Sequence, residues 1–215
     1  MRAWLLVSIV RLGAVAFLVA ACARAPMAGP LLGVPTTRGL PPSELAPGHW
    51  RLIFRWQYRE RVFSARGDGV ARVATPDSLR LDLFLDNGTS AGFVILIGDS
   101  LSLGAQEGAE RYVPPVPLLW AALGRVTMSG RDTVVRVDGD TLRAEIGPDP
   151  TWRLAYGREG VVRAERIADG RIEETVERTD STRILYRQPG AARTLTLSVQ
   201  NRIRESAFNA TIWRR

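Results

Sequence analysis

The sequence contains no lysine, a single cysteine and a single histidine among its 215 residues. One cysteine has no partner for a disulfide, and with only His49 beside it a Cys/His metal cluster is excluded. A histidine-based catalytic triad would have to use His49, and no glycine-rich phosphate-binding loop is present. These absences predict a protein that is not an enzyme and that uses no metal or cofactor.

Clustered positive charge is missing as well. All 29 basic residues are arginine, and they alternate along the chain with 22 acidic residues, for a net charge of +7. Nucleic-acid binding needs a basic face with stacking aromatic side chains, and the sequence shows no such face. We interpret the charges as the solvated side of a sheet, and we expect no nucleic-acid partner.

No uninterrupted apolar run is long enough to span a bilayer, but a shorter run lies near the N-terminus. It covers the ten residues 12–21, whereas a spanning helix needs about 20. Arg2 and Arg11 precede this run and small residues end it, which is typical of an export signal. We therefore predict a signal peptide over residues 1–21.

The predicted signal ends in the sequence Leu-Val-Ala-Ala-Cys at residues 18–22, which resembles the lipobox of bacterial lipoproteins. The resemblance implies that Cys22 carries a covalent diacylglycerol and, after cleavage, an N-acyl lipid. Two or more acyl chains hold a protein stably on a membrane. By the same resemblance, Ala23 at the next position implies the outer membrane, with the protein facing the periplasm.

Residues 22–47 hold six of the 13 prolines, so they cannot sustain a helix or a central strand. We predict an extended tether there, followed by one β-rich domain over residues 48–215, most simply a monomer. From residue 50 onward, short segments of strand-like sequence are separated by turn signals such as Asn87-Gly88 and Asp169-Gly170. The expected strands cover residues 51–58, 62–66, 70–74, 79–85, 93–97, 100–104, 133–137, 141–146, 151–156, 160–167, 171–178, 182–187, 194–200 and 208–213.

Two segments could form an apolar binding face. In the strand at 79–85 four leucines share one side, and a short helix at 115–123 begins with prolines, ends before Gly124 and is almost entirely apolar. The helix is either part of the core or a lid over an apolar groove. The groove would be lined by the leucine side of the strand, or by the opposite side around Phe84. The candidate ligand-binding residues are Leu79, Leu81, Leu83, Leu85, Leu119, Trp120 and Leu123.

Several segments in this order are similar to the LolA/LolB superfamily, whose members carry and receive lipoproteins. They are Phe-Arg-Trp at 54–56, Gly-Val-Ala-Arg-Val at 69–73, Pro-Asp-Ser-Leu-Arg-Leu-Asp at 76–82 and Gly-Asp-Ser-Leu at 98–101. The resemblance implies an antiparallel curled sheet, an incomplete barrel, with a short apolar lid helix. The lipid-anchored member, LolB, is the closer analogue. Its protruding apolar loop would correspond to residues 86–90, which are polar here.

The leading hypothesis is therefore a membrane-anchored envelope lipoprotein of the LolB-like type. Its apolar groove would bind acyl chains or lipidated protein, in lipoprotein localisation or lipid transport, because an apolar face favours a partner that needs no directional contacts. The alternative is a non-enzymatic envelope scaffold, with a filled core, that works through protein contacts.

Overall fold

The computed structural model describes residues 24–104, 113–129 and 132–214. It contains one antiparallel sheet of 13 strands in the order β1-β7-β8-β9-β10-β11-β12-β13-β2-β3-β4-β5-β6. Strands β1 and β6 do not pair with each other, so the sheet curls without closing. The predicted fold class, a mainly β, incomplete barrel with a short apolar helix, is confirmed.

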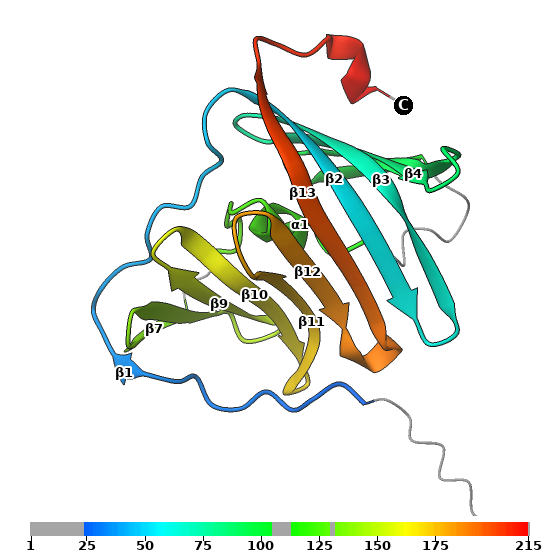
Figure 1. Ribbon diagram of the computed structural model, residues 1–215. Coiled ribbons are helices and arrows are strands. Elements are labelled where there is room, and N and C mark those ends of the chain that lie inside the picture. The colour runs from blue at the N-terminus through cyan, green and yellow to red at the C-terminus, as the bar shows by residue number, and fades with distance from the viewer. Residues whose placement is uncertain (1–23, 105–112, 130–131, 215) are drawn as a thin grey trace, which may run out of the picture.

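The elements follow one another along the chain as a meander, with one helix between β6 and β7 (Figure 1). Their bounds are β1 Val34–Pro35, β2 His49–Glu60, β3 Phe63–Ala74, β4 Ser78–Leu85, β5 Ser90–Ile97, β6 Ser100–Gly104, α1 Val116–Ala122, β7 Thr133–Asp138, β8 Thr141–Ile146, β9 Thr151–Gly157, β10 Gly160–Ala168, β11 Arg171–Arg178, β12 Arg183–Gln188, η2 Pro189–Ala191, β13 Arg193–Glu205 and η3 Ala210–Trp213.

The turn signals in the sequence form the predicted hairpins because their residues accept a positive φ. Gly88 has φ 80° between β4 and β5, and Asp169 and Gly170 have φ 49° and 68° between β10 and β11. Glycine reaches this left-handed region without steric cost, and aspartate reaches it more easily than most residues. Local sequence therefore determines where the strands reverse.

The strand predictions were wrong in two places. The two strands predicted at 62–66 and 70–74 are one continuous strand, β3, which begins at Phe63 and is not interrupted by Gly67 and Gly69. Residues 208–213 form no strand; their last part is the short 3₁₀ helix η3. The side chain of Asn209 accepts hydrogen bonds from the backbone N–H and the hydroxyl of Thr211, at 2.9 Å each, and this cap replaces strand pairing.

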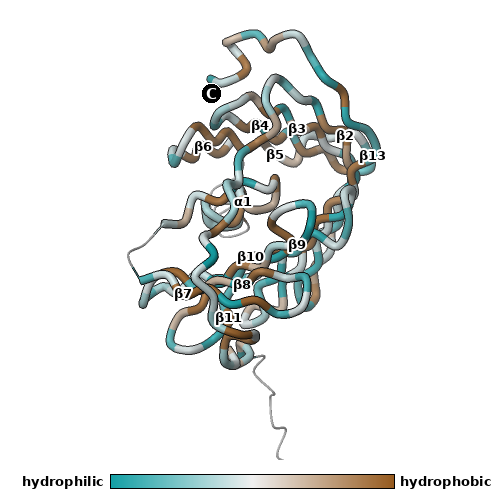
Figure 2. The backbone as a smooth tube through the Cα atoms, turned by 90° about the vertical axis from the view of Figure 1, so that its left-hand side faces the viewer, coloured by the Kyte–Doolittle hydropathy of each residue, from teal (hydrophilic) through white to brown (hydrophobic). Residues whose placement is uncertain are grey.

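The pairing of β13 with β2 joins two halves of the sheet that are far apart in sequence (Figure 1). Each half carries its own buried cluster. One is centred on β8–β12 and includes Leu154 and Val176, and the other is centred on β2–β5 and includes Phe54 and Leu79. Figure 2 shows α1 lying between the two halves, inside the curl of the sheet.

The N-terminal segment follows the outside of the second half before it enters β2 (Figure 1). The N–H of Ile172 donates to the carbonyl oxygen of Pro26 at 2.9 Å, and β1 pairs with β7. Near β2, the hydroxyl of Ser43 donates to the carbonyl oxygen of Gly124 at 2.6 Å. The division into a tether at 22–47 and a domain at 48–215 stays a prediction. The predicted signal peptide and Cys22 lie outside the described residues.

The glycines of β3 let two aromatic rings lie flat on the sheet. The indole N–H of Trp56 donates to the backbone oxygens of Asp68 and Phe84, at 3.0 and 3.1 Å, across Gly67. A methyl group at Gly67 would overlap the oxygen of Phe84, and one at Gly69 would overlap the ring of Phe54. These glycines are therefore needed for close approach.

We expect Gly67→Ala to lower the free energy of unfolding by about 1–3 kcal/mol, because the added methyl group forces strand β4 away. The control is Gly39→Ala, where nothing lies within 4 Å of the added carbon; its expected change is within about 0.5 kcal/mol. Urea denaturation of both variants measures the difference. Equal stability of the two variants would contradict the close approach at Gly67.

Candidate functional site

Strand β4 turns its leucines toward the inside of the curl. Leu79 is 1% exposed and Leu81, Leu83 and Leu85 are half-buried, and all four pack in the cluster of the first half. Phe84, on the opposite side of the same strand, is 37% exposed. Of the two sides that the sequence left open, the leucine side is therefore the concave one. We call these four residues the leucine face.

Helix α1 begins after its N-cap residue Pro115, and Pro117 lies in the first turn, where the fixed φ of proline suits a helix and its missing N–H costs no intrahelical bond. Leu118 and Ala121 are buried in the cluster of the second half, and Leu119 and Trp120 are buried in the cluster of the first half. The indole N–H of Trp120 donates to the carbonyl oxygen of Gly98 at 2.9 Å. The helix therefore packs against both halves at once.

The structure places all seven predicted site residues in one place. Leu119, Trp120 and Leu79 are buried members of the cluster of the first half, and Leu81, Leu83, Leu85 and Leu123 pack against it as half-buried residues. The sequence did not show how much of the concave face the helix fills. Trp120 is fully buried. The helix α1 is therefore docked on the sheet in this structure, whether it is part of the core or a lid.

A polar network lies on the concave face of the second half, and sequence reasoning missed it. The carboxylate of Glu174 accepts a hydrogen bond from the hydroxyl of Tyr186 at 2.6 Å and another from Nε of Arg166 at 2.7 Å. Burial, and then the hydrogen bond to Glu174, raise the pKa of Tyr186 well above its usual range. Tyr186 is therefore a hydrogen-bond donor at any ordinary pH. At these positions the concave face is therefore polar, and its polar groups are hydrogen-bonded to one another.

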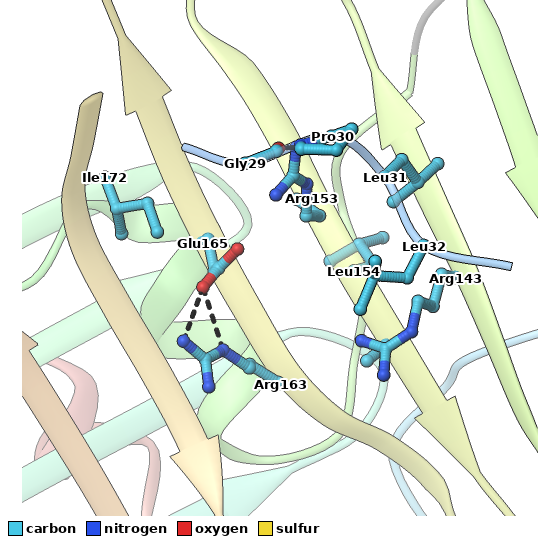
Figure 3. Close-up of a pocket in the computed structure, with 11 residues that line it drawn as sticks. Gly29, Pro30, Leu31, Leu32, Arg143, Arg153, Leu154, Arg163, Glu165 and Ile172 are labelled. Atoms are coloured by element: carbon cyan, nitrogen blue, oxygen red, sulfur yellow. Dashed lines mark hydrogen bonds and ion pairs between the residues drawn. The ribbon is translucent and has the colours of Figure 1, made fainter. Parts of the chain in front are cut away.

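Two hollows lie on the outer face instead, each beneath a terminal segment. The first, of about 320 Å³, lies between residues 29–32 and the outer side of β8–β11 (Figure 3). Its charged groups are paired: Arg163 with Glu165 at 2.6 Å, and Arg153 with Glu145. The second, of about 350 Å³, lies beside Ile212 and Phe84. Because the charged groups in the walls of the first hollow are already paired, we interpret these walls as the surface against which the N-terminal segment packs.

Within the described ranges of the chain, no group of three or more His, Cys, Asp or Glu side chains could hold a metal ion. Within the same ranges, no helix has the length and the apolar character to pass through a bilayer. The candidate site is thus an apolar face with a helix docked on it.

Sequence comparison identifies no relative: no family model matches the chain, and no curated protein matches it. Structural comparison finds proteins with a similar fold. An outer membrane lipoprotein-sorting protein domain from Vibrio parahaemolyticus superposes with a TM-score of 0.51 at 7% identity, over 77% of this chain and 89% of that domain. The chain has the fold of this sorting domain.

Two further structures are similar over a comparable range. A LolA superfamily protein from Nitrosomonas europaea matches at 9% identity with a TM-score of 0.47, over 80% of this chain and 92% of that chain. A DUF1329 family protein from Desulfovibrio piger matches at 7% identity with a TM-score of 0.47, over 78% and 90%. The resemblance noted in the sequence is confirmed for the fold.

Proposed function

We propose that this chain is a non-catalytic, lipid-anchored envelope lipoprotein whose leucine face binds acyl chains, either of free lipids or of lipidated protein. The observation that carries the proposal is the leucine face itself. Three of its four side chains remain half-buried although they lie inside the curl, next to Leu123 of the helix region. Apolar surface of this kind gains free energy when a hydrocarbon chain covers it, by about 25 cal/mol per Å².

The remaining parts of the proposal come from the sequence. Cys22 would carry the diacylglycerol and the N-acyl lipid, and Ala23 favours the outer membrane, so a monomer would face the periplasm from that surface. The Vibrio domain, described as lipoprotein-sorting, supports an envelope role through its fold. In this proposal α1 is the lid at the edge of the groove, and an acyl chain lies on β4 beside the helix.

One observation favours a second function. Leu118, Trp120 and Ala121 are at most 1% exposed, as in an ordinary core. A scaffold with a filled concave face, acting through protein contacts on its outer surface, would look the same at these positions. Ligand uptake distinguishes the two functions, because a filled face binds no acyl chain while it stays folded.

The test uses the mature chain, residues 22–215, with Cys22→Ala, purified from a bacterial periplasm without detergent. We expect native mass spectrometry to show a co-purifying lipid mass, and a fluorescent fatty acid to displace it. Leu83→Asn should weaken probe binding by about tenfold, since a polar amide then interrupts the face. Phe84→Asn, one residue away on the outer face, is the matched control and should bind as the parent does.

Circular dichroism establishes first that both variants are folded. A folded parent with an empty mass and no probe uptake would refute the acyl-binding proposal and leave the scaffold. Equal weakening by Leu83→Asn and Phe84→Asn would place the binding elsewhere than on the leucine face.

A further inference from the structure

Most arginines on the outer face of the sheet are neutralised. Arg51 pairs with Glu205 at 2.9 Å, and Arg187 pairs with Glu177 at 2.8 Å. The same holds for Arg55, Arg66, Arg72, Arg80, Arg143, Arg153 and Arg163, each of which pairs with a carboxylate. The charged outer face is thus largely a set of ion pairs.

Four arginines at one end of the concave face differ from these. Arg125, Arg178, Arg202 and Arg204 form no ion pair with any carboxylate of the described residues. We call this group the arginine end. At the opposite end of the same face, Arg166 and Arg193 are paired with Glu174 and Glu60, at 2.7 and 2.8 Å.

Two members of the arginine end share an aromatic ring. The guanidinium carbons of Arg202 and Arg204 lie 4.5 and 5.7 Å from the centroid of Trp50. Trp50 packs against the buried cluster of the first half, so these side chains are on the concave side of β13. The stacking holds the cations in place by their faces and leaves the N–H groups at their edges able to donate.

The other two members lie around the C-terminal end of α1. A methyl group at Gly124 would come within 2.7 Å of Nη1 of Arg178, so this side chain reaches the end of the helix. The guanidinium carbon of Arg125 lies 4.7 Å from the centroid of the Trp120 ring, and its buried Nη1 has no hydrogen-bond partner among the described residues. A buried N–H group without an acceptor is destabilising.

The electrostatic surroundings of Arg178 are mixed in sign. Burial and the charge of Arg202 lower the pKa of Arg178, and the charge of Glu159 raises it. The partial negative charge at the end of α1 favours a cation and explains Arg178 by itself. It does not explain why Nη1 of Arg125 is buried with no hydrogen-bond partner among the described residues.

The arginine end is continuous with the leucine face through the strand register. Arg202 pairs with Leu52 of β2, Leu52 with Ala71 of β3, and Ala71 with Leu81 of β4. Two residues further along β13, Arg204 pairs with Trp50, and the register continues from Trp50 through β3 to Leu79 of β4. Neighbouring strands are about 4.8 Å apart, so Arg202 and Leu81 are separated by about 14 Å.

We propose that the arginine end binds the phosphate headgroup of an anionic lipid whose acyl chains lie on the leucine face. This inference rests on the proposed function and names the class of ligand. Guanidinium groups donate two parallel hydrogen bonds to phosphate oxygens, and a phosphate would supply the acceptor that Arg125 lacks. A headgroup at the end of an apolar face matches the layout of a phospholipid.

The test titrates the mature Cys22→Ala chain, which contains every described element, with four soluble probes. These are dihexanoyl phosphatidylglycerol, dihexanoyl phosphatidylcholine, dihexanoylglycerol and inorganic phosphate. Isothermal titration calorimetry measures the affinity for each probe. We expect phosphatidylglycerol to bind at least about tenfold more tightly than dihexanoylglycerol, which has the same chains and no phosphate. The zwitterionic lipid should lie between them.

The double variant Arg178→Gln/Arg202→Gln should lose the preference for phosphatidylglycerol and keep its affinity for dihexanoylglycerol. The matched control is Arg55→Gln/Arg187→Gln, which removes the same charge from the outer face and should keep the preference. Loss of the preference in both variants would indicate a general charge effect and overturn the inference.

The remaining outcomes separate the inference from the function on which it rests. Equal affinities for phosphatidylglycerol and dihexanoylglycerol would refute the headgroup site and leave acyl binding intact. Binding of neither lipid by folded protein would refute the acyl-binding function. If inorganic phosphate binds as tightly as phosphatidylglycerol and competes with it, the site is one for free phosphate, and the lipid headgroup is overturned.

Discussion

Replacing Glu174 by leucine should lower the free energy of unfolding by about 3 kcal/mol or more, the range found when one partner of a buried ion pair is removed. Glu174 is 5% exposed and accepts hydrogen bonds from Arg166 and Tyr186. Without it, the hydroxyl of Tyr186 would be buried without its acceptor, and the half-buried guanidinium group of Arg166 would lose its carboxylate. Guanidinium chloride denaturation, followed by circular dichroism, measures the loss.

The same strand offers a matched control on its other face. Glu177 pairs with Arg187, and their side chains are 29% and 43% exposed. Exposed pairs contribute about 0–1 kcal/mol, so Glu177→Leu should change stability by no more than that. The double variant Arg166→Met/Glu174→Leu should recover much of the loss, because it removes the unpaired cation together with the carboxylate. A loss of similar size at Glu177 would show that leucine in β11 is itself responsible.

Trp120→Ala should lower the free energy of unfolding by about 3–5 kcal/mol, the range for removing a fully buried aromatic side chain. Trp120 has no exposed surface, packs beside Leu79 and Leu96, and donates its indole N–H to Gly98. Trp213→Ala is the matched control, because Trp213 is half-buried on η3 and should cost less. Denaturant unfolding of both variants gives the comparison.

The size of the Trp120 effect also measures how firmly α1 is docked. Suppose that α1 undocked at a small free-energy cost while the sheet stayed folded. The stability lost in Trp120→Ala could then not exceed the free energy of undocking, since the form with the undocked helix would become the native state. A loss of about 3 kcal/mol or more would show that α1 stays docked, so that in the proposed function the acyl chain would lie beside the helix, against Leu81, Leu83 and Leu85. A loss below about 1 kcal/mol would contradict the core packing of Trp120 and describe α1 as a lid that opens readily.

Strand positions and turns followed from the sequence because their causes are local. The alternation of leucines in β4 shows that they share a face, and the turn residues Gly88, Asp169 and Gly170 adopt the positive φ that tight hairpins require. The helix at Val116–Ala122 followed from the prolines at its start and its apolar composition. Where a local cap competed with alternation, at Asn209, the strand prediction failed.

The sequence by itself thus determined the antiparallel meander, the apolar helix and the membership of the leucine face. Only the tertiary structure decided which side of β4 is concave, that α1 packs on both halves, and that Glu174 pairs with Arg166 and accepts a hydrogen bond from Tyr186. It also decided which arginines form no ion pair with a carboxylate of the described residues. These features depend on contacts such as that between β13 and β2, whose residues are more than a hundred positions apart. Periodicity and turn chemistry act over a few residues, and so they carry no information about which distant strands the curl of the sheet brings together.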